Sequence, residues 1–175
     1  FARKNYFYPD LPKGYQITQV EAPLGTGGAL PVPGARGVAR VALRRLHLEE
    51  DTGKSLHPER GSGRPVSRLD FNRAGVPLAE LVTEPVLREP AEGAAFVAAL
   101  RRLVRWLGVS DGDMEKGHLR CDANVSLRPA GTAGLGVKTE LKNLNSIHGV
   151  ERALAAEIAR QRALLAAGGR VAPAT

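Results

Sequence analysis

Three consecutive carboxylates, Glu49, Glu50 and Asp51, lie in the segment HLEEDTGKS. A phosphate-binding loop also ends in GKS, but it requires a glycine five positions before the glycine of that triplet, where this chain has Leu48. Three carboxylates would also repel phosphate from a bare loop. Oxygen ligands of this kind suit Mg²⁺, which commonly joins one or two protein carboxylates to nucleotide phosphates. A solvated acidic turn is the plainer alternative.

Two acids lie on strand faces that are otherwise apolar. Because side chains alternate along a strand, Glu50 and Glu80 share their faces with Leu46, Leu48, Leu78 and Val82. A buried, unpaired carboxylate is costly unless a partner or a metal compensates it. A cation between the two acids would do so, and so would Arg73 or another basic side chain, so both interpretations stay open. His47 could support the acidic trio, although a single histidine on a strand is more often structural.

A second charged group follows the clearest alternating pattern in the chain. Residues 119–127 alternate apolar and polar side chains, and residues 137–142 do so again after the loop PAGTAGLG, which predicts an antiparallel hairpin. Its polar face carries Asp122 and Glu140 together with Arg120, Asn124, Lys138 and Lys142. A salt-bridged surface would have this composition. A metal and phosphate site would also use it, since arginine grips phosphate with two parallel hydrogen bonds.

The elements that must position these residues are few. We expect strands from Val38 to Glu50 and from Val76 to Glu84, the latter ended by Pro85. A helix begins at Pro90 and ends before Gly108, with an apolar stripe of Phe96, Leu100, Leu103 and Leu107. Arg101, Arg102 and Arg105 are then a solvated helix face or, less simply, an RNA contact. A last helix, capped by Ser146, has Val150, Leu154, Ile158 and Leu165 at near-helical spacing. This order predicts an α+β fold, mainly an antiparallel sheet with packed helices.

The remaining segments are predicted to be loops. The aromatic stretch from Tyr6 to Tyr15 is expected to be irregular but ordered, because it also holds Pro9, Pro12 and Gly14. Glycine and proline between Gly25 and Gly37 predict turns between short strands. The polar stretch from Asp51 to Pro65, with His57, Gly61 and Gly63, is expected to be an exposed, mobile loop.

Bulk composition limits the class of protein. A chain of 175 residues suits one domain with one core, and its formal net charge of +7 permits contact with phosphates. Cys121 is the only cysteine, which excludes an internal disulfide and fits a reducing compartment. No apolar run approaches the roughly 18 residues of a membrane span, so we expect no membrane partner. Hydrolase, kinase and dinucleotide-binding signatures are absent from the sequence, so nucleophilic hydrolysis has no support.

The chain carries five longer stretches in series: RKNYFYPDLPKGYQITQ, LHLEEDTGKS, LDFNRAGVPLAELVTEP, GVSDGDMEKGHLRCDANVSLRP and KTELKNLNS. In this order and spacing they resemble the B subunit of the glutamyl/aspartyl-tRNA amidotransferases over nearly the whole chain. The resemblance implies that residues 1–175 are part of a single catalytic domain, often described as a cradle. Compared with that family, the chain lacks the upstream strand, the zinc segment, and the C-terminal helical and tail domains. We therefore expect a piece truncated at both ends and inactive by itself.

The resemblance also implies a function. In that family, the B subunit uses ATP and Mg²⁺ to phosphorylate the side-chain carboxylate of glutamate or aspartate misacylated on tRNA, and ammonia from the A subunit then forms the amide. Partners would be the A and C subunits and aminoacylated tRNA, in the cytoplasm. Catalysis and Mg²⁺ binding would fall to Glu50, Glu80, Asp122 and Glu140, with Glu49 and His47 as second choices, and ATP binding to Arg120, Asn124, Lys138 and Lys142. A tRNA-binding scaffold and a metal-dependent hydrolase or nuclease are the alternatives.

Overall fold

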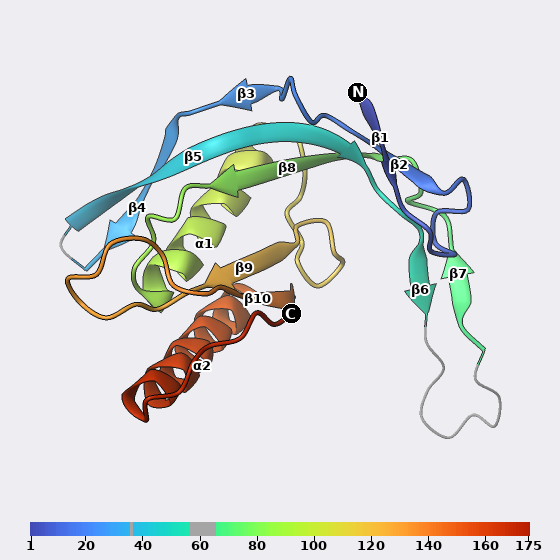
Figure 1. The fold of residues 1–175 in the computed structure, drawn as a ribbon. Helices are drawn as coiled ribbons and strands as arrows, with labels where there is room; N and C mark the ends of the chain where they lie inside the picture. Colours follow the sequence, from blue (N-terminus) through green and yellow to red (C-terminus); the bar gives the residue numbers. More distant parts are fainter. Residues whose placement is uncertain (36, 57–65) are drawn as a thin grey trace. The chain divides into compact units, whose positions relative to one another are not determined.

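The computed structural model describes residues 1–35, 37–56 and 66–175, and it shows an α+β protein with mostly antiparallel strands, as predicted (Figure 1). The described residues form two compact units. Unit 1 comprises Phe1–Ala29 and Ala42–Glu84, and unit 2 comprises Leu30–Val41 and Pro85–Thr175. The assignment of the whole chain to one catalytic domain stays a prediction.

Unit 1 is built on two strands that the sequence predicts well. β5 (Gly37–Glu50) begins in unit 2 and continues into unit 1, where it pairs antiparallel with β8 (Pro77–Thr83). The ladder runs from Leu43↔Thr83 to Glu50↔Pro77, with one irregularity between Leu43 and Arg45. β3 (Gly25–Thr26) also pairs with β5, and β2 (Tyr15–Thr18) joins it through Thr18↔Glu49. Both strand predictions are therefore confirmed.

The aromatic segment that follows Asn5 is an ordered, irregular loop, as predicted, but the short strands on either side of it were not predicted. β1 (Ala2–Asn5) pairs antiparallel with β2, so a loop rich in aromatic residues lies between two short strands. Within it, the hydroxyl of Tyr6 donates to a carboxylate oxygen of Asp10 at 3.0 Å. Backbone hydrogen bonds close the loop, including Tyr6 N–H to the carbonyl of Gly14 at 3.0 Å. Such pairing was hidden from the sequence because strands this short show too little alternation.

The polar stretch after Glu50 is also more ordered than predicted. β6 (Lys54–Leu56) pairs antiparallel with β7 (Arg68–Asp70), so part of the expected loop is a two-stranded ribbon. His57, Gly61 and Gly63 lie outside the described residues. At the base of the ribbon the amide of Gly53 donates to the carbonyl of Asp10 at 2.8 Å, which ties the aromatic loop to the ribbon.

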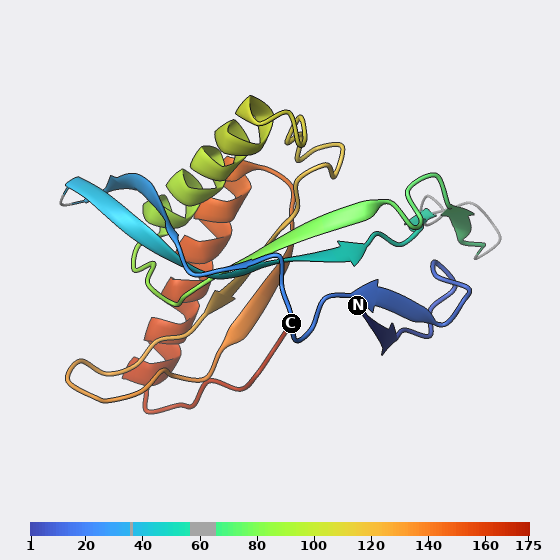
Figure 2. The ribbon, with the colours of Figure 1, turned by 90° about the horizontal axis from the view of Figure 1, so that it is seen from above.

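Unit 2 contains two helices that lie beside one another in both views (Figures 1 and 2). α1 (Pro90–Trp106) starts with proline in its first turn and is followed by Gly108 at φ 69°, as predicted. Its predicted apolar stripe is wrong at one end, because Leu103 and Leu107 are 38% and 56% exposed. The buried face is nearer the N-terminus, where Phe96 and Val97 accompany small residues.

Close helix contact explains those small residues. A Cβ placed on Gly93 would lie 2.6 Å from Cδ1 of Leu154 in α2 (Ile147–Ala166), so a larger residue at position 93 would require the Leu154 side chain to shift. α2 is capped as predicted, with the Ser146 hydroxyl accepting from the amide of Gly149 at 3.0 Å. Unit 2 also holds β4 (Ala29–Gly34), which pairs with β5.

The predicted hairpin is present in unit 2. β9 (Cys121–Val125) and β10 (Thr139–Leu144) pair antiparallel, with Glu140 directly opposite Asn124. The register shifts between Leu141 and Leu144, where Asn143 adopts φ 60°. Ala174 adds a parallel bridge to Thr139. Among the described residues, no helix is long and apolar enough to cross a membrane.

Candidate functional site

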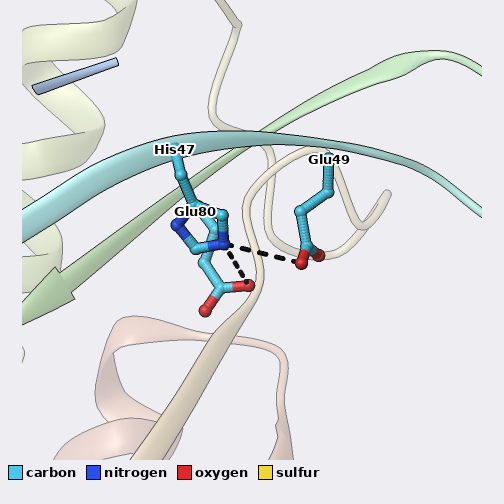
Figure 3. A group of neighbouring side chains, drawn as sticks. All are labelled: His47, Glu49 and Glu80. Atoms are coloured by element: carbon cyan, nitrogen blue, oxygen red, sulfur yellow. Dashed lines mark ion pairs between the residues drawn. The ribbon is translucent and has the colours of Figure 1, made fainter. Parts of the chain in front are cut away.

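The most concentrated group of potential metal ligands in the described residues is His47, Glu49 and Glu80, called here the His-Glu-Glu cluster (Figure 3). Cross-strand pairing assembles it. His47 lies directly opposite Glu80 in the β5–β8 ladder, and Glu49 follows His47 by two residues, so all three side chains share one face. One ligand atom from each lies within 4.8 Å of the others.

The imidazole of His47 lies between the two carboxylates. Its Nε2 is 3.5 Å from Oε1 of Glu49 and 3.7 Å from Oε2 of Glu80. The His47 side chain is 2% exposed, and its Nδ1 is enclosed without a hydrogen-bond partner among the described residues. A single imidazole N–H cannot donate well to two carboxylates at once, whereas a divalent cation accepts one ligand atom from each. The donor set of two carboxylates and one imidazole therefore fits a divalent metal.

Glu49 is held in place by neighbours from β2. Its two carboxylate oxygens accept from the Thr18 hydroxyl at 2.9 Å and from Nε2 of Gln16 at 3.1 Å. Its side chain is 9% exposed, while that of Glu80 is 48% exposed. Glu49 is thus a fixed anchor, and Glu80 is the acid that solvent, and hence a ligand, reaches.

The structure does not bring Glu50 and Glu80 together as the sequence analysis expected. Glu50 is paired with Pro77, so it lies on the opposite face of the ladder from Glu80. It is buried and forms an ion pair with Lys13, whose ammonium also lies 4.6 Å from the ring centre of Tyr15. A basic side chain therefore compensates Glu50, as one of the two open interpretations expected, and it is Lys13. The Nε of Arg73 lies 3.8 Å from a carboxylate oxygen of Asp51 instead.

The second predicted group is assembled on the polar face of the β9–β10 hairpin in unit 2. Glu140 faces Asn124 directly, and Asp122 follows Asn124 by two residues on the same face. Asp122 is exposed, and Glu140 lies 3.6 Å from the ammonium of Lys142. Arg120 and Lys138 immediately precede the two strands. The convergence of this group with Glu50 and Glu80 stays a prediction.

A buried polar network fixes that hairpin to α2, and the sequence analysis missed it. Gln161 is fully buried, and its Nε2 donates to the carbonyl of Val125 at 3.1 Å, to the hydroxyl of Thr139 at 3.2 Å and to Oε1 of Glu157 at 2.8 Å. Its Oε1 accepts from the amide of Leu127 at 3.0 Å. One side chain thus contacts both strands that carry the predicted acids.

A signal for this network was present in the helical spacing. Glu157 and Gln161 follow Val150 and Leu154 at spacings of three and four, so they lie on the buried face of α2. The expected stripe through Ile158 and Leu165 is therefore partly wrong, because Ile158 and Leu165 are only half-buried.

We expect acid to remove the stability that the Glu157 carboxylate contributes to this network. Arg160, which donates two hydrogen bonds to Glu157, holds the pKa of Glu157 at about 2, below its ordinary value of 4.5. A depressed pKa in the folded state stabilises the protein above the unfolded value, and that stabilisation is lost as the pH falls from 4.5 through about 2. Thermal unfolding of Glu157→Gln should show a flatter pH dependence over this window than the parent. Glu151→Gln, in the same helix, is the control, and equal slopes for Glu157→Gln and the parent would contradict the expectation.

Cys121 does not supply a nucleophile. Burial is the main cause that raises the pKa of its thiol to about 11, so the reactive thiolate is rare near neutral pH. The chemistry that the described residues support is therefore binding of cations and phosphates by carboxylates, guanidinium groups and ammonium groups.

Comparisons with known proteins found a matching family model and similar proteins. The family model described as "GatB/GatE catalytic domain" matches residues 1–174. The B subunit of the aspartyl/glutamyl-tRNA(Asn/Gln) amidotransferase of Salinibacter ruber is 56% identical over 170 residues, which cover 92% of this chain and 33% of the relative. The protein of the same name from Bordetella pertussis is 54% identical over 177 residues, covering 100% of this chain and 37% of the relative. That from Nitratidesulfovibrio vulgaris is 53% identical over 175 residues, covering 100% of this chain and 36% of the relative. The chain thus spans about a third of the length of these relatives.

Proposed function

Because the chain belongs to the GatB/GatE catalytic domain family, we propose that it supplies the ATP-dependent activation step in the B subunit of a tRNA-dependent amidotransferase. The substrate would be glutamate misacylated on glutamine tRNA or aspartate misacylated on asparagine tRNA. A side-chain carboxylate oxygen attacks the γ-phosphorus of ATP and ADP leaves. Ammonia supplied by the A subunit then attacks the acyl carbon and phosphate leaves, which gives the amide. The C subunit would complete the complex, which we place in the cytoplasm.

The observation that carries this proposal is the His-Glu-Glu cluster. Two anions, a carboxylate and a γ-phosphate, must approach each other, so the site has to offset their repulsion. Bound Mg²⁺ would supply that neutralisation and orient the phosphate oxygens. Glu49, fixed by Thr18 and Gln16, and Glu80, open to solvent, would hold the ion with His47. Glu50, which the sequence analysis expected as a ligand, lies on the other face of the ladder and is paired with Lys13, so we do not assign it to this ion.

The hairpin residues receive roles that follow from their charge. Asp122 and Glu140 are proposed as further carboxylate ligands. Arg120, Lys138 and Lys142 are proposed to grip the ATP phosphates or the substrate carboxylate, and Asn124 to orient a carboxylate or a water molecule. No protein nucleophile is required, because the substrate carboxylate itself attacks.

A trapping experiment tests the activation step in the complete three-subunit complex. With glutamyl-tRNA, ATP and Mg²⁺, but without glutamine, hydroxylamine should capture the acyl phosphate as a tRNA-linked hydroxamate while ADP accumulates. Omission of the divalent cation should abolish both products. The absence of ADP and hydroxamate would favour a tRNA-binding scaffold, and fragmented tRNA on a denaturing gel would favour a nuclease.

A further inference from the structure

A surface hollow of about 330 Å³ lies in unit 2, and three arginines line it. Its other lining residues are Ala98 and Ile147, the first residue of α2. Ala98, Arg101, Arg102 and Arg105 are spaced by three, one and three residues, so they form one continuous face of α1. We call Arg101, Arg102 and Arg105 the arginine stripe.

The arginine stripe lacks acidic partners. Within residues 1–35, 37–56 and 66–175, no carboxylate lies within ion-pair distance of these three guanidinium groups. Two arginines elsewhere are paired: Arg44 with Glu84 at 2.9 Å and Arg160 with Glu157 at 2.7 Å. Three adjacent unpaired cations repel one another, so this face is suited to an anion.

Arg101 is also held in position. A Cβ placed on Gly112, which has φ +62°, would lie 2.8 Å from Cγ of Arg101, so the loop after α1 packs closely on the arginine stem. The Nε of Arg101 is enclosed and has no hydrogen-bond acceptor among the described residues. Attraction to the helix dipole explains an arginine such as Arg105 in the last turn of α1. It does not explain an enclosed N–H without an acceptor, which is a costly arrangement in a folded protein.

An exposed aromatic residue adjoins the stripe. Trp106 is 84% exposed and follows Arg102 by four residues, so the indole and the guanidinium are neighbours on the helix surface. Guanidinium groups that bind phosphate, next to an exposed ring on which an unpaired base can stack, are the combination that single-stranded RNA segments require. A free phosphate would have no use for the ring, and an acidic protein segment would not need it.

We propose that the arginine stripe and Trp106 bind an unpaired segment of the tRNA substrate, with the arginines on backbone phosphates and the indole on a base. The proposal rests on the proposed function, because it assumes that tRNA is the substrate. It assigns to the C-terminal half of α1 a binding role separate from the two carboxylate groups described above.

Fluorescence anisotropy with labelled, unacylated glutamine tRNA and the complete complex tests this proposal. Arg102→Gln/Arg105→Gln should raise Kd by roughly tenfold and lower the slope of log Kd against log salt concentration by about 1.4, at about 0.7 for each single-strand phosphate that is no longer neutralised. Trp106→Ala should raise Kd by roughly tenfold and leave that slope unchanged, because stacking involves no phosphate. Arg152→Gln/Arg162→Gln removes the same charge from exposed positions of α2 and should change neither quantity beyond error.

The outcomes separate this proposal from the proposed function. Equal Kd values and slopes for the stripe variant, the α2 control and the parent would overturn the RNA site. Failure of the complex to assemble in the stripe variant, with unchanged tRNA affinity of the isolated variant protein, would also overturn it and assign the face to a protein partner. Because unacylated tRNA binding needs neither ATP nor an acyl group, the result holds whether or not the parent complex yields a hydroxamate. Where the hydroxamate forms, the stripe variant should raise KM for glutamyl-tRNA and leave kcat unchanged.

Discussion

Glu80→Gln in the full-length protein is expected to reduce ADP formation with glutamyl-tRNA by about 100-fold or more, while the A subunit still hydrolyses glutamine. The substitution removes a negative charge and nearly preserves shape. The Glu80 side chain is 48% exposed, so the variant should melt at the parent temperature. A loss of activity would then report electrostatics at the phosphoryl step and not misfolding.

A binding measurement makes this expectation independent of turnover. Titration of the complex with Mn²⁺, followed by electron paramagnetic resonance, should show weaker binding in Glu80→Gln and in His47→Ala than in the parent. Glu84→Gln is the matched control, because Glu84 follows β8 and is paired with the exposed Arg44. Unchanged ADP formation and unchanged Mn²⁺ affinity in Glu80→Gln would remove Glu80 from the proposed site and leave only the family membership standing.

The same titration separates the two adjacent acids of β5. Glu49→Gln should weaken Mn²⁺ binding, because Glu49 shares its strand face with His47 and Glu80. Glu50→Gln breaks the half-buried ion pair with Lys13, which is expected to lower the melting temperature. Melting temperatures must accordingly be compared before the Mn²⁺ affinities of these two variants.

Asp122→Asn is the second substitution with a large expected effect, a fall in ADP formation of about 100-fold. Asp122 is exposed on the hairpin, so its charge is expected to contribute little to folding stability. The same complex should keep its glutaminase activity and its melting temperature. The assay is ADP release with glutamyl-tRNA, together with the yield of trapped hydroxamate.

A control for charge removal is available in the same unit. Glu115 is exposed in the loop between α1 and β9, and Glu115→Gln should leave ADP formation unchanged. Equal activities for Asp122→Asn, Glu115→Gln and the parent would show that the hairpin acid is a surface group and not part of the kinase site.

The sequence by itself determined the long strands β5 and β8 and the β9–β10 hairpin, and the face on which each of their side chains lies. Alternation over residues 38–50 and 76–84 predicted β5 and β8, and alternation around Asp122 and Glu140 predicted the hairpin and its polar face. The reason is local, because a strand has a period of two wherever it pairs. The family resemblance, carried by long stretches in series, was confirmed over residues 1–174.

Tertiary structure alone decided which of those faces meet. The register between β5 and β8 places Glu80 opposite His47 and on the same face as Glu49. Glu50, the residue after Glu49, lies on the other face. The alternation of side chains is a property of one strand, whereas register depends on how two strands that are distant in sequence pair with each other. The burial of Gln161 also depends on tertiary structure. Its four hydrogen-bond partners are Val125 in β9, Leu127 after it, Thr139 in β10 and Glu157 in α2. A polar side chain can lie on the buried face of a helix, where apolar side chains are expected, only if the fold supplies its hydrogen-bond partners.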